Sequence, residues 1–335
     1  MAETIRVRTP QRIFSLPLVA TLLFLVGVDL AIGHGTRNSA VRRLLAHARE
    51  SSAAQVMGLG NSLMGVGFVE QSVDSGMQLD SRHGAVNLAM GGSSPVEQLL
   101  LLRYGLRHGI RPRIVVYGFF DFQLTHPVKF ATRELIANHA MLYYVEPEYA
   151  GQFYELSLHD RVEFEVMRHF ELFVDRGAMW RTVEGFRRTL GQQGMPPEKQ
   201  NPMGRAVDFA DLEYPSAPAF IAECGRASRN PLIPPIREIA LQAEAAGAKV
   251  YFVEMPMSPD HVQEFYDQPQ WSTGYRAHLK QMLGGLGVSY IDASHWMPEE
   301  DSFADQMHLS YAGSKQFSLR LGEYLREAQM GKVQD

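Results

Sequence analysis

Cysteine is almost absent from this chain of 335 residues, in which Cys224 is the only one. A single cysteine excludes an intramolecular disulfide and any zinc site built on cysteine pairs. The simplest interpretation of Cys224 is a structural thiol. The twelve histidines are scattered and form no HExxH pattern, so the sequence predicts no dedicated metal site.

The chain also lacks a strong charge of either sign, since its formal net charge is -5. No basic stripe is interleaved with aromatic residues, so we expect no nucleic-acid partner. Hydrophobic residues make up 45% of the sequence and charged residues 21%, which is the composition of a chain with a packed core. The length suits one large domain, or one domain with a sizeable insertion.

Only one long hydrophobic run is present, at residues 13–33, and Arg6, Arg8 and Arg12 precede it. The run is near the length that spans a bilayer, and the positive-inside rule places the chain after about residue 34 outside the cytoplasm. An uncleaved signal anchor and a cleaved signal peptide both remain open. The run is long for a cleaved segment, so we favour a single-pass anchor with the C-terminal domain in the periplasm or at the cell surface.

After a polar, helix-prone stalk at 34–52, the chain alternates between short apolar runs and helical patterns. Short continuous apolar runs are typical of strands buried on both faces. The alternation predicts an α/β fold, a three-layer α/β/α sandwich with a central parallel sheet. The expected strands are 53–59, 85–89, 113–118, 249–254 and 288–291, and the expected helices are 95–108, 235–246, 274–283 and 311–328.

The α/β domain is expected to span residues 53–330, with an insertion at about 125–235 that breaks the alternation. The insertion has helical patterns around 131–139 and 149–190, and then becomes rich in proline and glycine. It follows the third strand, at the edge where ligands bind in such sheets. A lid or substrate wall is one interpretation, and simple packing of its aromatic residues onto the domain is the other.

Two short motifs supply the parts of an acyl-transfer site. Gly-Asn-Ser-Leu at 60–63 follows the first strand, and Asp-Gln-Met-His at 305–308 precedes the last helix. A serine hydroxyl needs a base within hydrogen-bond reach before it becomes a nucleophile. Ser62, His308 and Asp305 therefore are the catalytic candidates, as nucleophile, base and orienting carboxylate. The structural alternatives are a turn that is glycine-rich for steric reasons and an aspartate that caps a helix.

Together these motifs resemble the blocks of the GDSL/SGNH hydrolase superfamily. The run from Asn87 to Ser93 matches the second block of that family with Gly92 in register, and Leu309-Ser310-x-x-Gly313 extends the last block. The resemblance covers roughly 53–125 and 245–328. It implies a flavodoxin-like SGNH fold and an acyl-enzyme on Ser62, with no metal or organic cofactor.

The oxyanion formed in such a reaction needs fixed donors. The backbone N–H groups of Ser62 and Gly92 and the side chain of Asn61 are the candidates. The family usually carries Gly-x-Asn-Asp after the third strand, but this chain has Phe120 at the asparagine position, and phenylalanine cannot donate. Either Asn61, Gln123 or a backbone amide replaces that asparagine, or the oxyanion hole is weaker. Gln123 is also a candidate for substrate binding, as is Asp121, for which capping a loop is an equal alternative.

Loss of that asparagine is also seen in branches that resemble membrane-anchored polymer-modifying proteins, such as alginate acetylation proteins and the D-alanyl transfer protein of teichoic acid. We therefore expect an extracytoplasmic serine esterase or O-acyltransferase. Its substrate would be acyl esters, with acetyl favoured, of a cell-envelope or exopolysaccharide glycan, and other envelope polysaccharide-assembly proteins are candidate partners. Two alternatives stay open: a lipid or small-ester hydrolase, and a non-catalytic glycan-binding or scaffold component. A Ser62–His308 distance too long for a hydrogen bond would favour the last.

Overall fold

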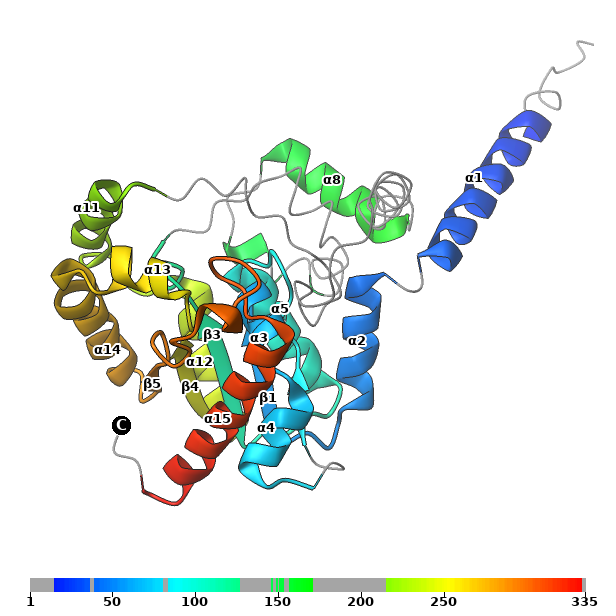
Figure 1. The fold of residues 1–335 in the computed structure, drawn as a ribbon. Coiled ribbons are helices and arrows are strands. Elements are labelled where there is room, and N and C mark those ends of the chain that lie inside the picture. The colour runs from blue at the N-terminus through cyan, green and yellow to red at the C-terminus, as the bar shows by residue number, and fades with distance from the viewer. Residues whose placement is uncertain are drawn as a thin grey trace, which may run out of the picture.

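A computed structural model describes residues 15–36, 39–80, 84–126, 146, 149, 151–153, 157–170 and 215–332. Five parallel strands form one sheet in the order β2-β1-β3-β4-β5 (Figure 1). All five predicted strands are confirmed, each within about three residues of its expected bounds. They are β1 (Val56–Gly60), β2 (Ala85–Asn87), β3 (Ile114–Phe119), β4 (Lys249–Glu254) and β5 (Ser289–Asp292).

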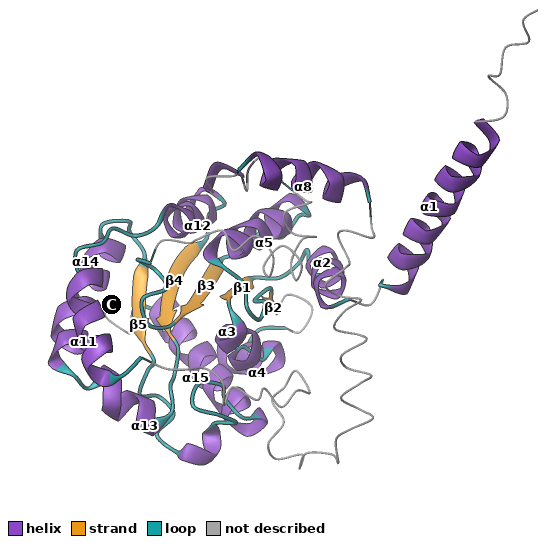
Figure 2. Ribbon diagram, turned by 90° about the horizontal axis from the view of Figure 1, so that it is seen from above, coloured by secondary structure: helices purple, strands orange, loops and turns teal. Residues whose placement is uncertain are grey.

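Helices cover both faces of this sheet, as Figure 2 shows from above. One layer contains α3 (Ser62–Gly67), α4 (Glu70–Met77) and α15 (Tyr311–Gln329). The other contains α5 (Pro95–Arg107) and α12 (Pro234–Ala245), with α14 (Arg276–Gly284) against the edge strand β5. Every residue of β1 and β3 is buried, as a strand covered on both faces requires. The predicted three-layer α/β/α architecture is confirmed.

Serine supplies the start signal of α5. The Ser94 hydroxyl accepts a hydrogen bond from the Glu97 N–H at 3.5 Å, and the Glu97 carboxylate accepts one from the Ser94 N–H at 2.5 Å. This reciprocal pair is a capping box, and Pro95 occupies the first turn, where no N–H is needed. Ser94 is therefore the N-cap of α5.

Helices α4 and α15 cross in backbone contact. A Cβ added to Gly76 would lie 2.3 Å from the Leu319 carbonyl oxygen, and one added to Gly322 would lie 2.5 Å from the Val73 carbonyl oxygen. Both oxygens belong to backbone that cannot rotate away. Glycine at these two positions therefore sets how closely the last helix approaches the layer that carries α3.

We predict that Gly322→Ala lowers the free energy of unfolding by about 1–3 kcal/mol, because the added methyl group overpacks the α4–α15 contact. Equilibrium unfolding in urea measures this change. The matched control is Gly225→Ala on α11 (Ala217–Ala227), where an added Cβ meets nothing within 4 Å. The control should gain up to about 1 kcal/mol from helix propensity. Equal urea midpoints for Gly322→Ala and the wild type would contradict the packing argument.

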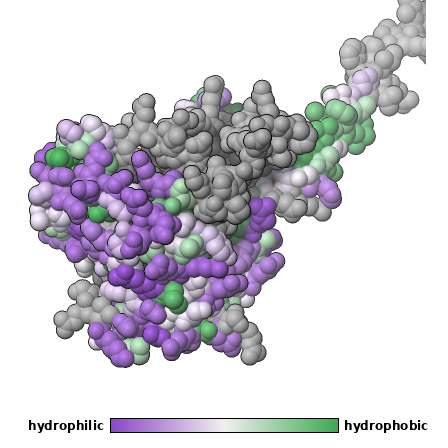
Figure 3. Space-filling view, viewed as in Figure 1, coloured by the Kyte–Doolittle hydropathy of each residue, from purple (hydrophilic) through white to green (hydrophobic). Residues whose placement is uncertain are grey.

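Near the N-terminus, α1 (Ser15–Gly35) projects from the body of the protein, and Figure 3 shows its apolar surface. It is long and apolar enough to cross a membrane, and a signal sequence can have the same length and composition. The predicted stalk contains α2 (Ala40–Glu50), which buries Val41, Leu45 and Ala48 in the core beside α5. That part of the stalk thus packs on the domain and does not extend away from it. The boundary of the anchor stays a prediction.

The predicted insertion at 125–235 lies largely outside the described residues, including its expected helix at 131–139. Within 149–190 the structure describes α8 (Leu158–His169) and the short η2 (Gly151–Phe153). Within the proline-rich part it describes α11, which the sequence analysis did not anticipate. Pro218 stands in the first turn of α11, where proline starts a helix and does not break one.

Candidate active site

The site lies where the strand order reverses. From β1 the chain moves to β2 on one side, and β3 then pairs with the other side of β1. Loops that follow the two central strands diverge at such a switch point and leave a crevice at the carboxyl edge of the sheet. Ser62 follows β1 and Phe120 follows β3, while Gly60 pairs with Gly118 across the two strands. The motif at 60–63 and the residues that follow β3 therefore meet at this edge.

A tight turn delivers Ser62 to the first turn of α3. Gly60 has φ +150°, and a Cβ there would lie 2.6 Å from the Met64 Cβ and 2.7 Å from the Gly118 carbonyl oxygen. Only glycine fits this close approach. Asn61 then caps the helix, because its Oδ1 accepts a hydrogen bond from the Leu63 N–H at 2.9 Å. The Ser62 N–H is one of the first-turn donors that have no partner inside the helix.

The loop that carries His308 is closed by an antiparallel bridge between Phe303 and Leu309. Ser310 follows the bridge and caps α15, its hydroxyl accepting from the Gly313 N–H at 3.2 Å. Asp305 is therefore not the cap of the last helix.

The three predicted catalytic side chains lie within hydrogen-bond distance of one another, in the order Ser62, His308, Asp305. His308 Nε2 lies 2.9 Å from Ser62 Oγ, and His308 Nδ1 lies 3.1 Å from both carboxylate oxygens of Asp305. The imidazole is buried, with 1% of the residue exposed, whereas Ser62 is half-buried. A half-buried hydroxyl with a sheltered base behind it can receive a substrate from the crevice and pass its proton inward.

Asp305 is held as a carboxylate. Its Oδ1 also accepts hydrogen bonds from the N–H groups of Met307 at 2.8 Å and His308 at 2.7 Å. Burial alone would raise the pKa of Asp305, but the hydrogen bond and charge of His308 and the two backbone amides outweigh it and hold the pKa below its ordinary value. The ionised group accepts from Nδ1–H, which leaves Nε2 as the acceptor for the serine proton.

This lowered pKa predicts a pH-dependent contribution to stability. A carboxyl whose pKa is lower in the folded than in the unfolded state stabilises the fold above the unfolded value, and the contribution disappears as pH falls through the folded value. Asp305→Asn removes it. The difference in unfolding free energy between wild type and variant, measured in urea, should be largest near neutral pH and shrink below about pH 4. A difference that stays constant with pH would contradict this assignment.

The glycine loop after β2 borders the nucleophile. Its Met90 N–H donates to the Gly60 carbonyl at 3.0 Å, which fixes the loop to the end of β1. A Cβ added to Gly91 would lie 3.6 Å from the Ser62 Cβ, so Gly91 faces the serine directly. Gly92, which the sequence analysis favoured, is exposed, with φ +71°. Within the described part of the chain, neither glycine N–H takes part in a hydrogen bond.

The loop after β3 holds the other predicted residues. Asp121 has φ +44°, and its Oδ1 accepts from the Tyr266 hydroxyl at 2.7 Å and lies 3.7 Å from His261 Nε2. Its own N–H donates to the Tyr266 oxygen at 3.1 Å, which is the geometry of the loop-capping interpretation. Phe120 is half-buried against the core. The Gln123 Oε1 is buried and has no hydrogen-bond partner among the described residues.

A buried ion pair at the ends of β4 and β5 was not foreseen from the sequence. Glu254 is fully buried and accepts hydrogen bonds from Arg276 at 2.7 and 2.9 Å and from the Trp271 indole N–H at 3.1 Å. Arg276 also lies 3.1 Å from Asp292. Burial raises the pKa of Glu254 even though Arg276 opposes the shift. The pair links two strand ends beside the site but does not reach Ser62.

Arg276→Met should lower the free energy of unfolding by about 3–5 kcal/mol, because it leaves the Glu254 carboxylate buried without its cation. Thermal and urea unfolding measure the loss. The matched control is the double variant Arg276→Met, Glu254→Gln, which removes the buried charge as well and should recover part of the stability. A double variant less stable than Arg276→Met would contradict the argument.

Other features of the described residues do not add to this site. No group of three or more His, Cys, Asp or Glu side chains in the described ranges is placed to hold a metal ion. Cys224 is buried, and burial raises the pKa of its thiol to about 11, which matches a structural thiol.

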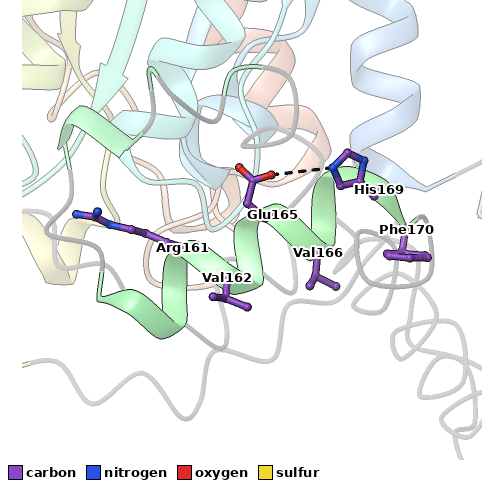
Figure 4. A pocket seen from close by; sticks show the side chains of 6 residues that line it. All are labelled: Arg161, Val162, Glu165, Val166, His169 and Phe170. Atoms are coloured by element: carbon purple, nitrogen blue, oxygen red, sulfur yellow. Dashed lines mark ion pairs between the residues drawn. The ribbon is translucent and has the colours of Figure 1, made fainter.

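Figure 4 shows a hollow on α8. It is lined by Arg161, Val162, Glu165, Val166, His169 and Phe170, with Glu165 and His169 4.0 Å apart.

The fold and the three side chains define a class: a flavodoxin-like α/β domain with a serine, histidine and aspartate at its switch point. A protein-family model matches residues 233–329, which is less than half of the chain. A search among curated proteins found no match to this sequence.

Two solved structures are similar to this chain. One is a candidate acylhydrolase from Bacteroides fragilis NCTC 9343, with 9% identity, coverage of 85% of this chain and 95% of that one, and a TM-score of 0.36. The other is TesA, with 13% identity, coverage of 82% and 98%, and a TM-score of 0.37. The class rests on the strand order and on the three side chains of this chain.

Proposed function

We propose that this protein is a serine esterase or O-acyltransferase of the SGNH type, which acts outside the cytoplasm on acyl esters of a cell-envelope or exopolysaccharide glycan, with acetyl as the favoured acyl group. The observation that carries the proposal is the line from Ser62 Oγ to His308 Nε2 at 2.9 Å and from His308 Nδ1 to Asp305 at 3.1 Å. These are the contacts that a nucleophile, a general base and its orienting carboxylate need.

In the first half-reaction, Ser62 Oγ attacks the ester carbonyl while its proton moves to His308 Nε2. The imidazolium is stabilised by Asp305, and it gives the proton to the leaving sugar oxygen as the C–O bond breaks. In the second half-reaction, water or another sugar hydroxyl loses its proton to His308 and attacks the acyl-enzyme. The bond between the acyl carbon and Ser62 Oγ then breaks, and His308 returns the proton to Ser62. The choice between water and a sugar decides between hydrolysis and transfer.

The oxyanion would be stabilised by the N–H of Ser62 and by the glycine loop, where Gly91 faces the serine and Gly92 carries a second N–H outside any described hydrogen bond. Asn61 and Gln123 remain candidates to replace the donor that Phe120 cannot supply. Asn61 already uses its Oδ1 to cap α3, which leaves its Nδ2 as the donor. Gln123 would have to donate through its Nε2, and its buried Oε1 has no described partner.

The apolar helix α1 and the resemblance to polymer-modifying branches support the extracytoplasmic glycan substrate. A lipid or small-ester hydrolase stays the alternative. A wide apolar cleft lined by the insertion would favour it, and the insertion lies mostly outside the described residues. The short Ser62–His308 contact speaks against a non-catalytic scaffold, since that alternative expects a distance too long for a hydrogen bond.

The test is acyl release by the full-length protein in detergent. Acetylated xylan, p-nitrophenyl acetate and p-nitrophenyl palmitate are compared, with Ser62→Ala as the control. The proposal expects acetate release from the glycan or the acetyl ester that depends on Ser62. Activity on palmitate alone would replace it with the lipid hydrolase. A folded protein inactive on all three, with and without an added oligosaccharide acceptor, would replace it with the scaffold.

A further inference from the structure

The helix that carries Ser62 is only six residues long, and its last carbonyl groups have no partners inside the helix. Two side chains from elsewhere in the chain supply those partners. The first is Asn87, at the end of β2, whose Nδ2 donates to the Phe68 carbonyl at 2.8 Å and to the Gly65 carbonyl at 3.2 Å. The rear end of α3 is therefore tied to the strand that leads into the glycine loop.

The second side chain is Ser318 on α15. Its hydroxyl donates to the Gly67 carbonyl at 2.5 Å and accepts from the Val69 N–H at 2.8 Å. Ser318 is fully buried, and both partners lie at the point where α3 ends. A buried hydroxyl that satisfies one carbonyl and one N–H leaves neither unpaired in the core.

Each of these two residues belongs to a segment that carries another part of the site. Asn87 Oδ1 accepts from the Ala89 N–H at 3.0 Å, which shapes the approach to Gly91. Its own N–H donates to Glu70 at 2.7 Å, so the residue is fixed through three groups. Ser318 lies on the helix that begins just after His308. The C-terminal end of α3 is thus held by two segments, and each of these segments leads to a part of the site near Ser62: β2 to the glycine loop, and α15 to the His308 loop.

We propose that Asn87 and Ser318 are positioning residues that hold α3 so that Ser62 stays within hydrogen-bond distance of His308 and beside Gly91. The inference rests on the proposed function of Ser62 as a nucleophile. A short, stiff helix passes a displacement at its rear end to its first residue. A misplacement of about 1 Å can cost on the order of 100-fold in rate, although neither residue touches the substrate.

The experiment measures covalent labelling of Ser62 by a fluorophosphonate probe in the full-length protein in detergent. Three quantities are determined separately: the maximal rate constant of labelling, the affinity for the probe and the final labelled fraction. Asn87→Ala and Ser318→Ala should lower the maximal rate constant by about 10- to 100-fold. Probe affinity and final labelled fraction should stay unchanged. A merely structural role would reduce the labelled fraction together with the folded fraction and leave the rate constant of the folded protein as it was.

The matched control is Ser314→Ala, one turn earlier on the same helix. Ser314 is as buried as Ser318, but its hydroxyl has no hydrogen-bond partner in the described structure, so its loss should leave labelling unchanged. Wild-type rate constants in both Asn87→Ala and Ser318→Ala would overturn the inference and leave the proposed function standing. If Ser318→Ala does not fold, the half-buried Asn87 decides alone. A folded wild-type protein that takes up no probe would overturn the proposed function and the inference together.

Discussion

The Ser62→Ala protein should hydrolyse p-nitrophenyl acetate with a kcat/KM lower than that of the wild type by a factor on the order of 10⁴ or more. The reason is geometric. Ser62 Oγ lies within hydrogen-bond distance of His308 Nε2, at 2.9 Å. Without it the imidazole has no nucleophile to activate, and only the binding of the ester and the oxyanion donors remain.

The control for this variant is its stability. The Ser62 side chain is half-buried, so urea unfolding of Ser62→Ala should match that of the wild type. Ser52→Ala, which changes an exposed serine before β1, should keep the full rate. A folded Ser62→Ala protein whose kcat/KM stays within tenfold of the wild type would contradict the proposed role of this residue.

Asp305→Asn is expected to lower kcat by about 10⁴-fold, because it changes the tautomer of the base. The N–H groups of Met307 and His308 occupy one oxygen of the carboxylate and would hold the amide oxygen of asparagine in the same place. The amide NH₂ would then face His308 Nδ1 and force it to accept. The proton of the neutral imidazole would move to Nε2, which could no longer take the proton from Ser62.

The measurement is the dependence of kcat on pH for wild type and variant. Since a raised pH leaves the imidazole neutral but does not correct its tautomer, the deficit of Asp305→Asn should persist on the alkaline side. The matched control is Asp301→Asn on the same loop, whose side chain is exposed and should not affect the rate. Equal rates for Asp305→Asn and the wild type would show that the carboxylate does not orient the base.

The sheet was predictable because its central strands β1 and β3 are short, continuous apolar runs, which strands covered on both faces need. The catalytic candidates could be predicted from the sequence for a related reason. Ser62 stands directly after β1, and Asp305 and His308 belong to a single loop, so local sequence holds most of their geometry. That Ser62 and His308 approach each other depends on the sheet order, which the sequence supported only through the family resemblance.

The residues that the sequence analysis missed depend on contacts between distant segments. Ser318 contacts the end of α3 across 251 positions of sequence, and Arg276 on α14 pairs with Glu254 at the end of β4. No local pattern marks either of them. Gly91 and Gly92 are adjacent and identical, so the sequence alone could not decide which faces Ser62. The backbone turn decides it, since Gly92 takes the left-handed conformation and Gly91 lies against the serine.

The most direct test of the central proposal, an activated serine at residue 62, is labelling of the full-length protein with a fluorophosphonate probe, read by intact mass and peptide mapping. The proposal predicts a single adduct on Ser62 that is lost in His308→Ala, since that variant keeps the hydroxyl but removes its base. An adduct on another residue, or none on wild-type protein shown to be folded, would contradict it.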